Sequence, residues 1–121
     1  MATILTVDDS PSIRQMIKVA LEPAGHSVIE AGDGAQGLTR AQSSRPDLVI
    51  TDLNMPVMNG MELIRALRKL PSLTGLPIVF LTTESNDAVK QEAKGAGATG
   101  WITKPFKPDQ LLAVVGKLVR S

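Results

Sequence analysis

Short apolar runs alternate with segments of helical periodicity from one end of the chain to the other. Each run is four or five residues long, which is the length of a strand rather than of a helix. Strands that are apolar almost throughout are typical of a parallel sheet covered on both faces. The predicted strands are Thr3–Val7, Ser27–Ala31, Leu48–Asp52, Pro77–Leu81 and Gly100–Thr103.

A segment of helical period follows each predicted strand. In the first segment Ile13, Ile17 and Leu21 recur at the spacing of one helix face. Ser10 suits the N-cap of that helix, and Pro11 suits its first turn. The fourth segment has a thin apolar face and two glycines near its end, which predicts a weakly packed helix. The predicted helices are Pro11–Pro23, Ala35–Ser44, Met61–Leu70, Asn86–Gly97 and Pro108–Val119.

This alternation predicts an α/β fold in which a strand and a helix are repeated five times, (βα)5. Strands that alternate with helices form a doubly wound, five-stranded parallel sheet with helices on both faces, and its crossovers should be right-handed. The 121 residues suit one hydrophobic core. Because no linker or low-complexity tract divides them, we expect a single domain over 1–121 with no output domain.

Composition and charge exclude several classes of function. The net charge is +1 with acidic and basic residues interspersed, so nucleic acid and membrane surfaces are not expected partners. The absence of cysteine excludes disulfides, cysteine-bound zinc and a thiol nucleophile. No signal peptide is visible, and no apolar stretch approaches the roughly 20 residues that span a bilayer. A cytoplasmic location is therefore expected.

Acidic residues stand at the ends of two predicted strands. Asp8 and Asp9 follow the first strand, and Asp52 ends the third. Strands of a parallel sheet end on one edge, where such folds bind ligands. Like charges ~4 Å apart repel by about 4 kcal/mol at an effective dielectric constant near 20, so three carboxylates at this edge require a cation. Oxygen ligands without nearby His or Cys fit Mg²⁺, or Mn²⁺, better than zinc.

Polar residues also end the fourth and fifth predicted strands. The Lys104 ammonium could contact one oxygen of a phosphate, and the Thr82 hydroxyl could donate to another, which predicts a metal-assisted phosphate site. A carboxylate there could attack phosphorus to form an aspartyl phosphate. Spacing alone allows any of Asp8, Asp9 and Asp52, and Asp52 is favoured because it ends the central strand. The alternative is that these acidic residues only cap a helix and a loop.

Four short motifs lie at these strand ends. They are Val7-Asp8-Asp9-Ser10, Asp52-Leu53-Asn54-Met55-Pro56 with Asn59-Gly60, Leu81-Thr82, and Lys104-Pro105-Phe106. Together they resemble the motif set of the receiver domain of two-component response regulators, over the full chain. The resemblance implies a flavodoxin-like fold with strand order 2-1-3-4-5, and a single-domain protein of the chemotaxis type.

The resemblance also implies which residues carry out phosphorylation. Asp52 is the phospho-acceptor, and the phosphohistidine of a histidine kinase or a phosphotransfer protein is the donor. Asp8, Asp9 and Asp52 bind Mg²⁺, together with the backbone carbonyl of Asn54. His26 is the only histidine and is expected in a surface turn away from the acidic edge, so the donor must be another protein.

Further residues would respond to the phosphoryl group if the resemblance holds. Thr82 and Lys104 bind its oxygens, and the Lys104–Pro105 peptide bond is cis, which a proline at the second position permits. Trp101 occupies the aromatic switch position, where Tyr, Phe or His is usual. An indole ring is larger than these, so the alternative is a tryptophan that only packs on the last two helices.

Asn54 and Glu84 occupy the two positions that tune hydrolysis of the phosphoryl group. Their residue types resemble those of chemotaxis regulators, so we expect a phosphorylated lifetime of seconds to minutes. Arg14, Gln15 and Lys18 are expected on the polar face of the first helix, where the resemblance places contacts with the kinase.

The favoured function is a phosphorylation-dependent switch that at most catalyses its own phosphorylation and dephosphorylation. We expect a monomer whose surface over the last two helices and the strand between them changes to bind a separate effector, such as a flagellar motor component. A phosphorelay intermediate or a phosphate sink would use the same chemistry. A phosphatase of the haloacid-dehalogenase type is disfavoured because Asn54 stands where its general acid is required, and a flavodoxin-like cofactor binder is disfavoured because the carboxylates would repel phosphate.

Overall fold

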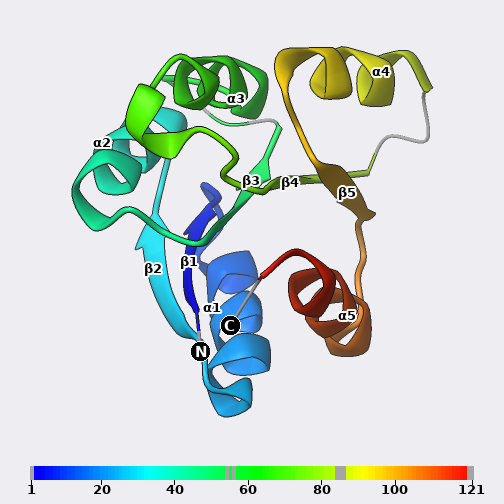
Figure 1. Ribbon diagram of the computed structural model, residues 1–121. Coiled ribbons are helices and arrows are strands. Elements are labelled where there is room, and N and C mark those ends of the chain that lie inside the picture. The colour runs from blue at the N-terminus through cyan, green and yellow to red at the C-terminus, as the bar shows by residue number, and fades with distance from the viewer. Residues whose placement is uncertain (1, 54, 56, 84–86, 120–121) are drawn as a thin grey trace.

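A five-stranded parallel sheet forms the centre of the molecule, with helices on both sides (Figure 1). The computed structural model describes residues 2–119 except 54, 56 and 84–86. The strand order is β2-β1-β3-β4-β5, so the doubly wound fold and the order implied by the family resemblance are confirmed. The strands are β1 (Thr3–Val7), β2 (Ser27–Ala31), β3 (Leu48–Asp52), β4 (Ile78–Thr82) and β5 (Gly100–Thr103).

The five predicted helices are present, and their ends differ slightly from the predicted ones. The first α-helix stops at Leu21, and a 3-10 turn over Glu22–Ala24 replaces its predicted last residues. A second 3-10 turn, Pro71–Leu73, precedes β4. The α-helices are α1 (Pro11–Leu21), α2 (Gly34–Ser44), α3 (Gly60–Arg68), α4 (Asp87–Ala96) and α5 (Pro108–Leu118).

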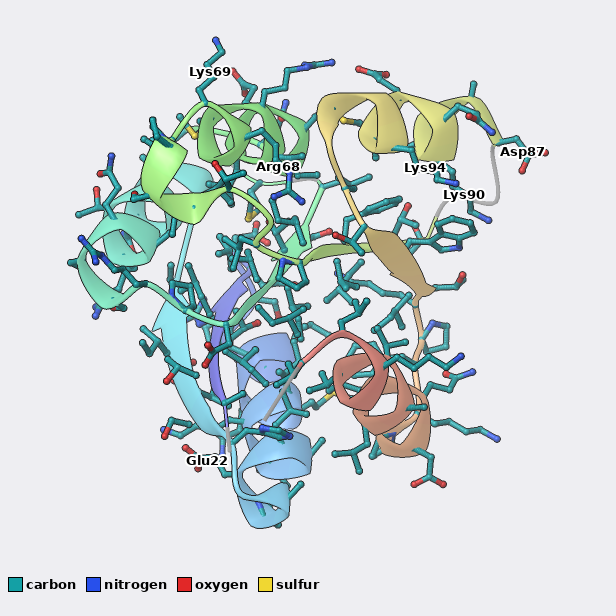
Figure 2. The ribbon with its side chains drawn as sticks, viewed as in Figure 1. Glu22, Arg68, Lys69, Asp87, Lys90 and Lys94 are labelled. Carbon is teal, nitrogen blue, oxygen red and sulfur yellow. The ribbon has the colours of Figure 1, made fainter. Side chains whose placement is uncertain are left out.

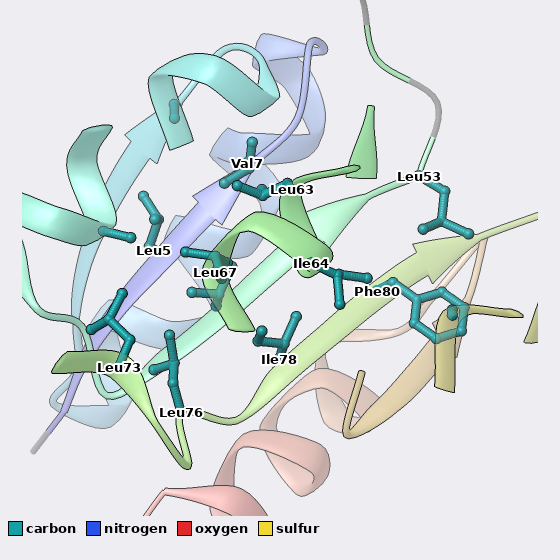
Figure 3. Packing of buried hydrophobic residues seen from close by; sticks show 14 residues of the cluster. Leu5, Val7, Leu53, Leu63, Ile64, Leu67, Leu73, Leu76, Ile78 and Phe80 are labelled. Carbon is teal, nitrogen blue, oxygen red and sulfur yellow. The ribbon is translucent and has the colours of Figure 1, made fainter. Parts of the chain in front are cut away.

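The sheet separates two layers of buried apolar side chains. Successive residues of a strand point to opposite faces. Leu5 and Val7 of β1 belong to the layer that α2, α3 and α4 cover, whereas Ile4 belongs to the layer that α1 and α5 cover. Figure 3 shows the first layer, in which Ile64 of α3 lies close to Phe80 of β4. Charged side chains such as those of Glu22, Lys69 and Asp87 lie on the outside (Figure 2).

Capping residues start several helices at the edge of the sheet where the strands end. The Ser10 hydroxyl accepts a hydrogen bond from the backbone of Ile13 at 3.3 Å, as predicted. Asp33 caps α2, and Asn59 caps α3 in a reciprocal pair with Glu62. These caps satisfy free backbone N–H groups and fix where the loops above the sheet return to it.

At the amino ends of the strands, reciprocal hydrogen bonds join each of two strands to the residue that precedes a neighbouring strand. Thr3 N donates to Asp47 Oδ2 at 2.8 Å, and Asp47 N donates to the Thr3 carbonyl at 2.7 Å. Ile78 N donates to Thr99 Oγ1 at 3.0 Å, and Thr99 N donates to the Ile78 carbonyl at 2.7 Å. Over the part of the chain that the structure describes, no helix is long and apolar enough to cross a membrane.

Candidate functional site

The carboxyl ends of β1 and β3 bring three aspartates together. Val7 and Thr51 are neighbours in the register of these two strands, so the residues that follow each of them converge. One carboxylate oxygen from each of Asp8, Asp9 and Asp52 lies within 4.8 Å of the other two. Asp8 and Asp52 are buried and Asp9 is exposed, so the cluster is open to solvent on one side.

Lys104 contacts this cluster from the end of β5. Its Nζ atom lies 3.3 Å from Asp52 Oδ2 and 3.5 Å from Asp8 Oδ2, and its side chain is 18% exposed. Its backbone N–H donates to the Thr82 carbonyl at 2.9 Å, which links it to the end of β4. The structure therefore places Lys104 and Thr82 at the same edge as the aspartates.

The Asp8 carboxylate is the most deeply buried acidic group of the cluster. Ser10 N donates to its Oδ1 at 2.8 Å, and its Oδ2 has no hydrogen-bond donor among the described residues, although Lys104 is close. Burial raises the pKa of Asp8 above its ordinary value, opposed by the Ser10 hydrogen bond and the Lys104 charge. The nearby charges of Asp52 and Asp9 raise this pKa further.

These donors fit a hard divalent cation. Three ionised carboxylates and one ammonium leave a formal charge of −2, which a divalent cation balances. Oxygen atoms are the ligands that Mg²⁺ and Mn²⁺ prefer, and the buried Asp8 Oδ2 lacks a hydrogen-bond donor within the described part of the chain. Asp8, Asp9 and Asp52 are the residues that would hold the metal.

The Asp52 carboxylate is held in one orientation. Leu53 N donates to its Oδ1 at 2.8 Å, while Lys104 faces its Oδ2. Asp52 is 8% exposed, so a donor can reach it only from the edge of the sheet. It lies at the end of β3, the central strand of the sheet.

A glycine allows the chain after β3 to fold closely over Asp52. A Cβ atom at Gly60 would lie 2.0 Å from the Asp52 carbonyl oxygen, which excludes any larger residue. Gly60 N also donates to the Leu53 carbonyl at 3.0 Å. Nearby, Val57 has a φ of 70°, which is strained for a β-branched residue. In the sequence, Gly60 is noticed only as part of the Asn59-Gly60 motif. The structure shows that glycine is needed because the backbone at residue 60 lies against the Asp52 carbonyl.

Arg14 is a residue whose position the sequence did not reveal. It was expected on the polar face of the first helix, but its side chain is only 18% exposed. Its Nη1 donates to the backbone carbonyl of Asp8, and its Nε donates to Glu30 Oε1 of β2 at 3.1 Å. Lys18 Nζ lies 3.9 Å from Glu30 Oε2. Arg14 therefore lies directly behind the acidic cluster.

Trp101 lies on the edge strand β5 and is 39% exposed. Its ring centroid is 6.2 Å from that of Phe80, and the Nζ atom of Lys90 lies 4.9 Å from its ring. The indole also lines a shallow depression of about 350 Å³ together with residues of α5 such as Gln110 and Val114. Trp101 thus contacts α4 through Lys90 and faces a depression that α5 also lines, and both the switch role and the packing alternative stay predictions.

Three further predictions concern the Lys104–Pro105 peptide bond, the pair Asn54 and Glu84, and His26. Lys104–Pro105 is a cis peptide bond. Asn54 and Glu84 lie outside the described residues. His26 precedes β2, at the edge of the sheet opposite to the aspartates, so it is remote from the cluster.

Comparison with known proteins gives one consistent family. Residues 4–116 match the family described as "Response regulator receiver domain". The chemotaxis protein CheY4 of Vibrio cholerae is 47% identical, with a TM-score of 0.94 over 98% of this chain and 99% of that chain. The receiver domain of sensor histidine kinase PA1611 from Pseudomonas aeruginosa PAO1, crystallised with a magnesium ion coordinated in its active site cleft, is 28% identical, with a TM-score of 0.90 over 99% of this chain and 98% of that chain.

A longer relative matches over only part of its length. The DNA-binding response regulator MtrA of Mycolicibacterium smegmatis is 40% identical over 117 residues, which are 97% of this chain and 50% of that protein. The chain therefore spans about half the length of this relative.

Proposed function

The chain belongs to the receiver domain family of two-component response regulators, and we propose that its Asp52 carboxylate accepts a phosphoryl group from the phosphohistidine of a histidine kinase or phosphotransfer protein. The single observation that carries this proposal is the position of the Lys104 ammonium, 3.3 Å from Asp52 and 3.5 Å from Asp8. A carboxylate nucleophile and a cation that can bind the transferred oxygens are thereby side by side.

The transfer is a substitution at phosphorus. An Asp52 oxygen forms the new O–P bond as the P–N bond to the donor imidazole breaks, and the imidazole nitrogen keeps the electron pair of that bond and takes up a proton. Asp52 is then an acyl phosphate. Catalysis of such transfers is mostly positioning and charge neutralisation, and Leu53 N and Lys104 position the Asp52 carboxylate for it.

Asp8, Asp9 and Asp52 would hold Mg²⁺, or Mn²⁺, and the family resemblance adds the backbone carbonyl of Asn54. When bound, the cation neutralises charge on the phosphoryl oxygens. The acidic cluster of this chain supports the assignment. The receiver domain of PA1611, with its coordinated magnesium, supports it too.

Phosphorylation would change the surface formed by α4, β5 and α5. The phosphoryl group adds roughly −1.5 to −2 charge beside Lys104 and Thr82, and a backbone hydrogen bond joins these two residues. A shift of either residue would move the ends of β4 and β5 together. Trp101 of β5 would then change its contact with Lys90 of α4, which is the switch role proposed for Trp101.

The altered surface would bind a separate effector protein. The similarity to the chemotaxis protein CheY4 over 99% of that chain supports a role in motility, exercised in the cytoplasm as a monomeric receiver. A flagellar motor component would be one such effector. A phosphorelay intermediate would use the same site and pass the phosphoryl group to a further histidine.

Intact-mass measurement after treatment with acetyl phosphate and Mg²⁺ tests the proposal. The wild-type chain should gain one phosphoryl group, and Asp52→Asn should gain none. Asp47→Asn is a matched control at the opposite edge of the sheet and should gain as much as wild type. A wild-type chain that gains no mass, or an Asp52→Asn variant that gains it equally, would contradict the proposal.

The same experiment gives the lifetime of the phosphorylated form. After the donor is removed, loss of the added mass should take seconds to minutes, because Asn54 and Glu84 are proposed to favour hydrolysis. A species that persists for many hours would refute this role for Asn54 and Glu84 while leaving Asp52 as the acceptor.

A further inference from the structure

Arg14 joins three parts of the structure behind the acidic cluster. It belongs to α1, its Nη1 atom donates to the carbonyl of Asp8, and its Nε atom donates to Glu30 of β2. Its side chain is 18% exposed, so these contacts are partly shielded from water. Arg14 therefore connects β2 to the loop that follows β1, and it is not a solvated surface charge.

The carbonyl that Arg14 holds belongs to the peptide unit between Asp8 and Asp9. A peptide unit is planar, so a contact that fixes this carbonyl also fixes the direction of the Asp9 backbone N–H. The two side chains on either side of the unit are two of the three carboxylates of the cluster. The orientation of this single peptide plane therefore affects the positions of both carboxylates.

Glu30 holds the Arg14 guanidinium from a fixed position in the sheet. It lies within β2, where it pairs in register with Thr6 of β1. The guanidinium group presents its donors in a fixed planar fork, so it can contact a strand carboxylate and a loop carbonyl at once. An ammonium group is a point charge and lacks this geometry.

We propose that Arg14 is a positioning residue that fixes the Asp8–Asp9 peptide and thereby strengthens binding of the divalent cation. This inference rests on the proposed function, because it assumes that Asp8 and Asp9 bind the metal. Residues that orient metal ligands typically change metal affinity by about 10–100-fold when they are replaced. The alternative is that Arg14 only ties α1 to β2.

Lys18 is a matched control within the same helix. Its Nζ atom lies 3.9 Å from Glu30 Oε2, so Lys18→Met removes a cation from the same carboxylate, one helical turn further along α1. Arg14→Met removes both the contact with Glu30 and the contact with the Asp8 carbonyl. A difference between the two variants therefore reports the two hydrogen bonds of Arg14, to the Asp8 carbonyl and to Glu30, and not the loss of a positive charge near Glu30.

Two measurements on the full chain test the proposal. Isothermal titration with Mg²⁺ should show affinity about tenfold weaker in Arg14→Met, an intermediate loss in Arg14→Lys, and wild-type affinity in Lys18→Met. In the metal-free protein, amide hydrogen exchange followed by NMR should be faster at Asp9 and Ser10 in Arg14→Met than in Lys18→Met.

The possible outcomes separate this proposal from the function it rests on. Wild-type Mg²⁺ affinity in Arg14→Met, or an equal loss in Lys18→Met, would overturn the positioning role and leave the phosphorylation switch intact. If the wild-type chain itself bound no Mg²⁺, the proposed metal site and this inference would both fail. Should Arg14→Met not fold, Arg14→Lys and Glu30→Gln provide the same comparison, and wild-type affinity in both would overturn the role.

Discussion

The buried Asp8 carboxylate gives the metal-free protein a specific dependence on pH. Burial raises the pKa of Asp8 in the folded state above its ordinary value, so the folded chain binds this proton more tightly than the unfolded chain. Stability then falls as pH rises from the ordinary pKa through the raised pKa, and the loss persists above it. The ionised form of Asp8 is thus the unfavourable one in the absence of a metal.

Asp8→Asn should therefore make the metal-free protein more stable at neutral pH. The amide oxygen can still accept the hydrogen bond from Ser10 N, and no charge is buried. Thermal unfolding over a pH series should give a higher Tm for the variant above the raised pKa, and a smaller difference at acidic pH. Asp9→Asn, which removes an exposed charge, should change Tm less. A lower Tm for Asp8→Asn at every pH would contradict this explanation.

The meeting of the strand-end residues at one end of the sheet could be predicted from the sequence, whereas the contacts of Arg14 behind them could not. Asp8, Asp52 and Lys104 follow apolar runs, and parallel strands bring such positions to one edge. Arg14 occupies a polar helix position that looks like any solvated residue, and its partner at Asp8 is a backbone carbonyl, which every residue has. No sequence pattern identifies a contact of that kind.

At the scale of elements, α4 buries few apolar side chains and also makes polar contacts with α3. Of its residues only Ala93 is buried, as its thin apolar face predicted. Arg65 of α3 pairs with Glu92 of α4 at 3.2 Å, and Arg68 donates to the Gly97 carbonyl at 2.9 Å from its place between the two helices (Figure 2). A helix with few buried apolar contacts repacks more easily than one anchored in the core.

The Lys90 ammonium of α4 contacts the indole of Trp101 in β5, and removal of this contact should be visible in fluorescence. Lys90→Met deletes a cation–π interaction of about 0.5–1 kcal/mol. Because Trp101 is the only tryptophan, its emission reports this contact directly, and quenching by acrylamide should increase. Lys94→Met, one turn further along α4, should leave quenching unchanged. Equal quenching in wild type and Lys90→Met would show that Lys90 does not shield the ring.

The strands were predicted more accurately than the ends of the helices. β1, β2, β3 and β5 begin and end where the apolar runs do, and β4 is shifted by one residue. Helix ends depend on capping partners that only the fold selects: α3 begins at Gly60 because Asn59 and Glu62 cap each other. The chain after Leu21 tightens into a 3-10 turn at Pro23, which periodicity does not reveal.

At the scale of the whole molecule, the cation should stabilise the fold. A ligand that binds only the folded state at 100 times its Kd adds about 2.7 kcal/mol to the free energy of unfolding. Urea unfolding at neutral pH should therefore show greater stability with saturating Mg²⁺ than without it. Asp9→Asn should fold normally, because Asp9 is exposed, but gain little from Mg²⁺. Equal gains in both proteins would argue against Asp9 as a ligand.

The carboxyl ends and the amino ends of the parallel strands bear different kinds of residues. The aspartates lie at the carboxyl ends of the strands, and the reciprocal hydrogen bonds of Thr3 with Asp47 and of Ile78 with Thr99 lie at the amino ends. A protein engineer seeking heat resistance could therefore randomise positions around these hydrogen-bonded pairs and select variants with a higher Tm. Phosphorylation of Asp52 could be assayed as an independent screen of these variants, since the aspartates lie at the other end of the strands.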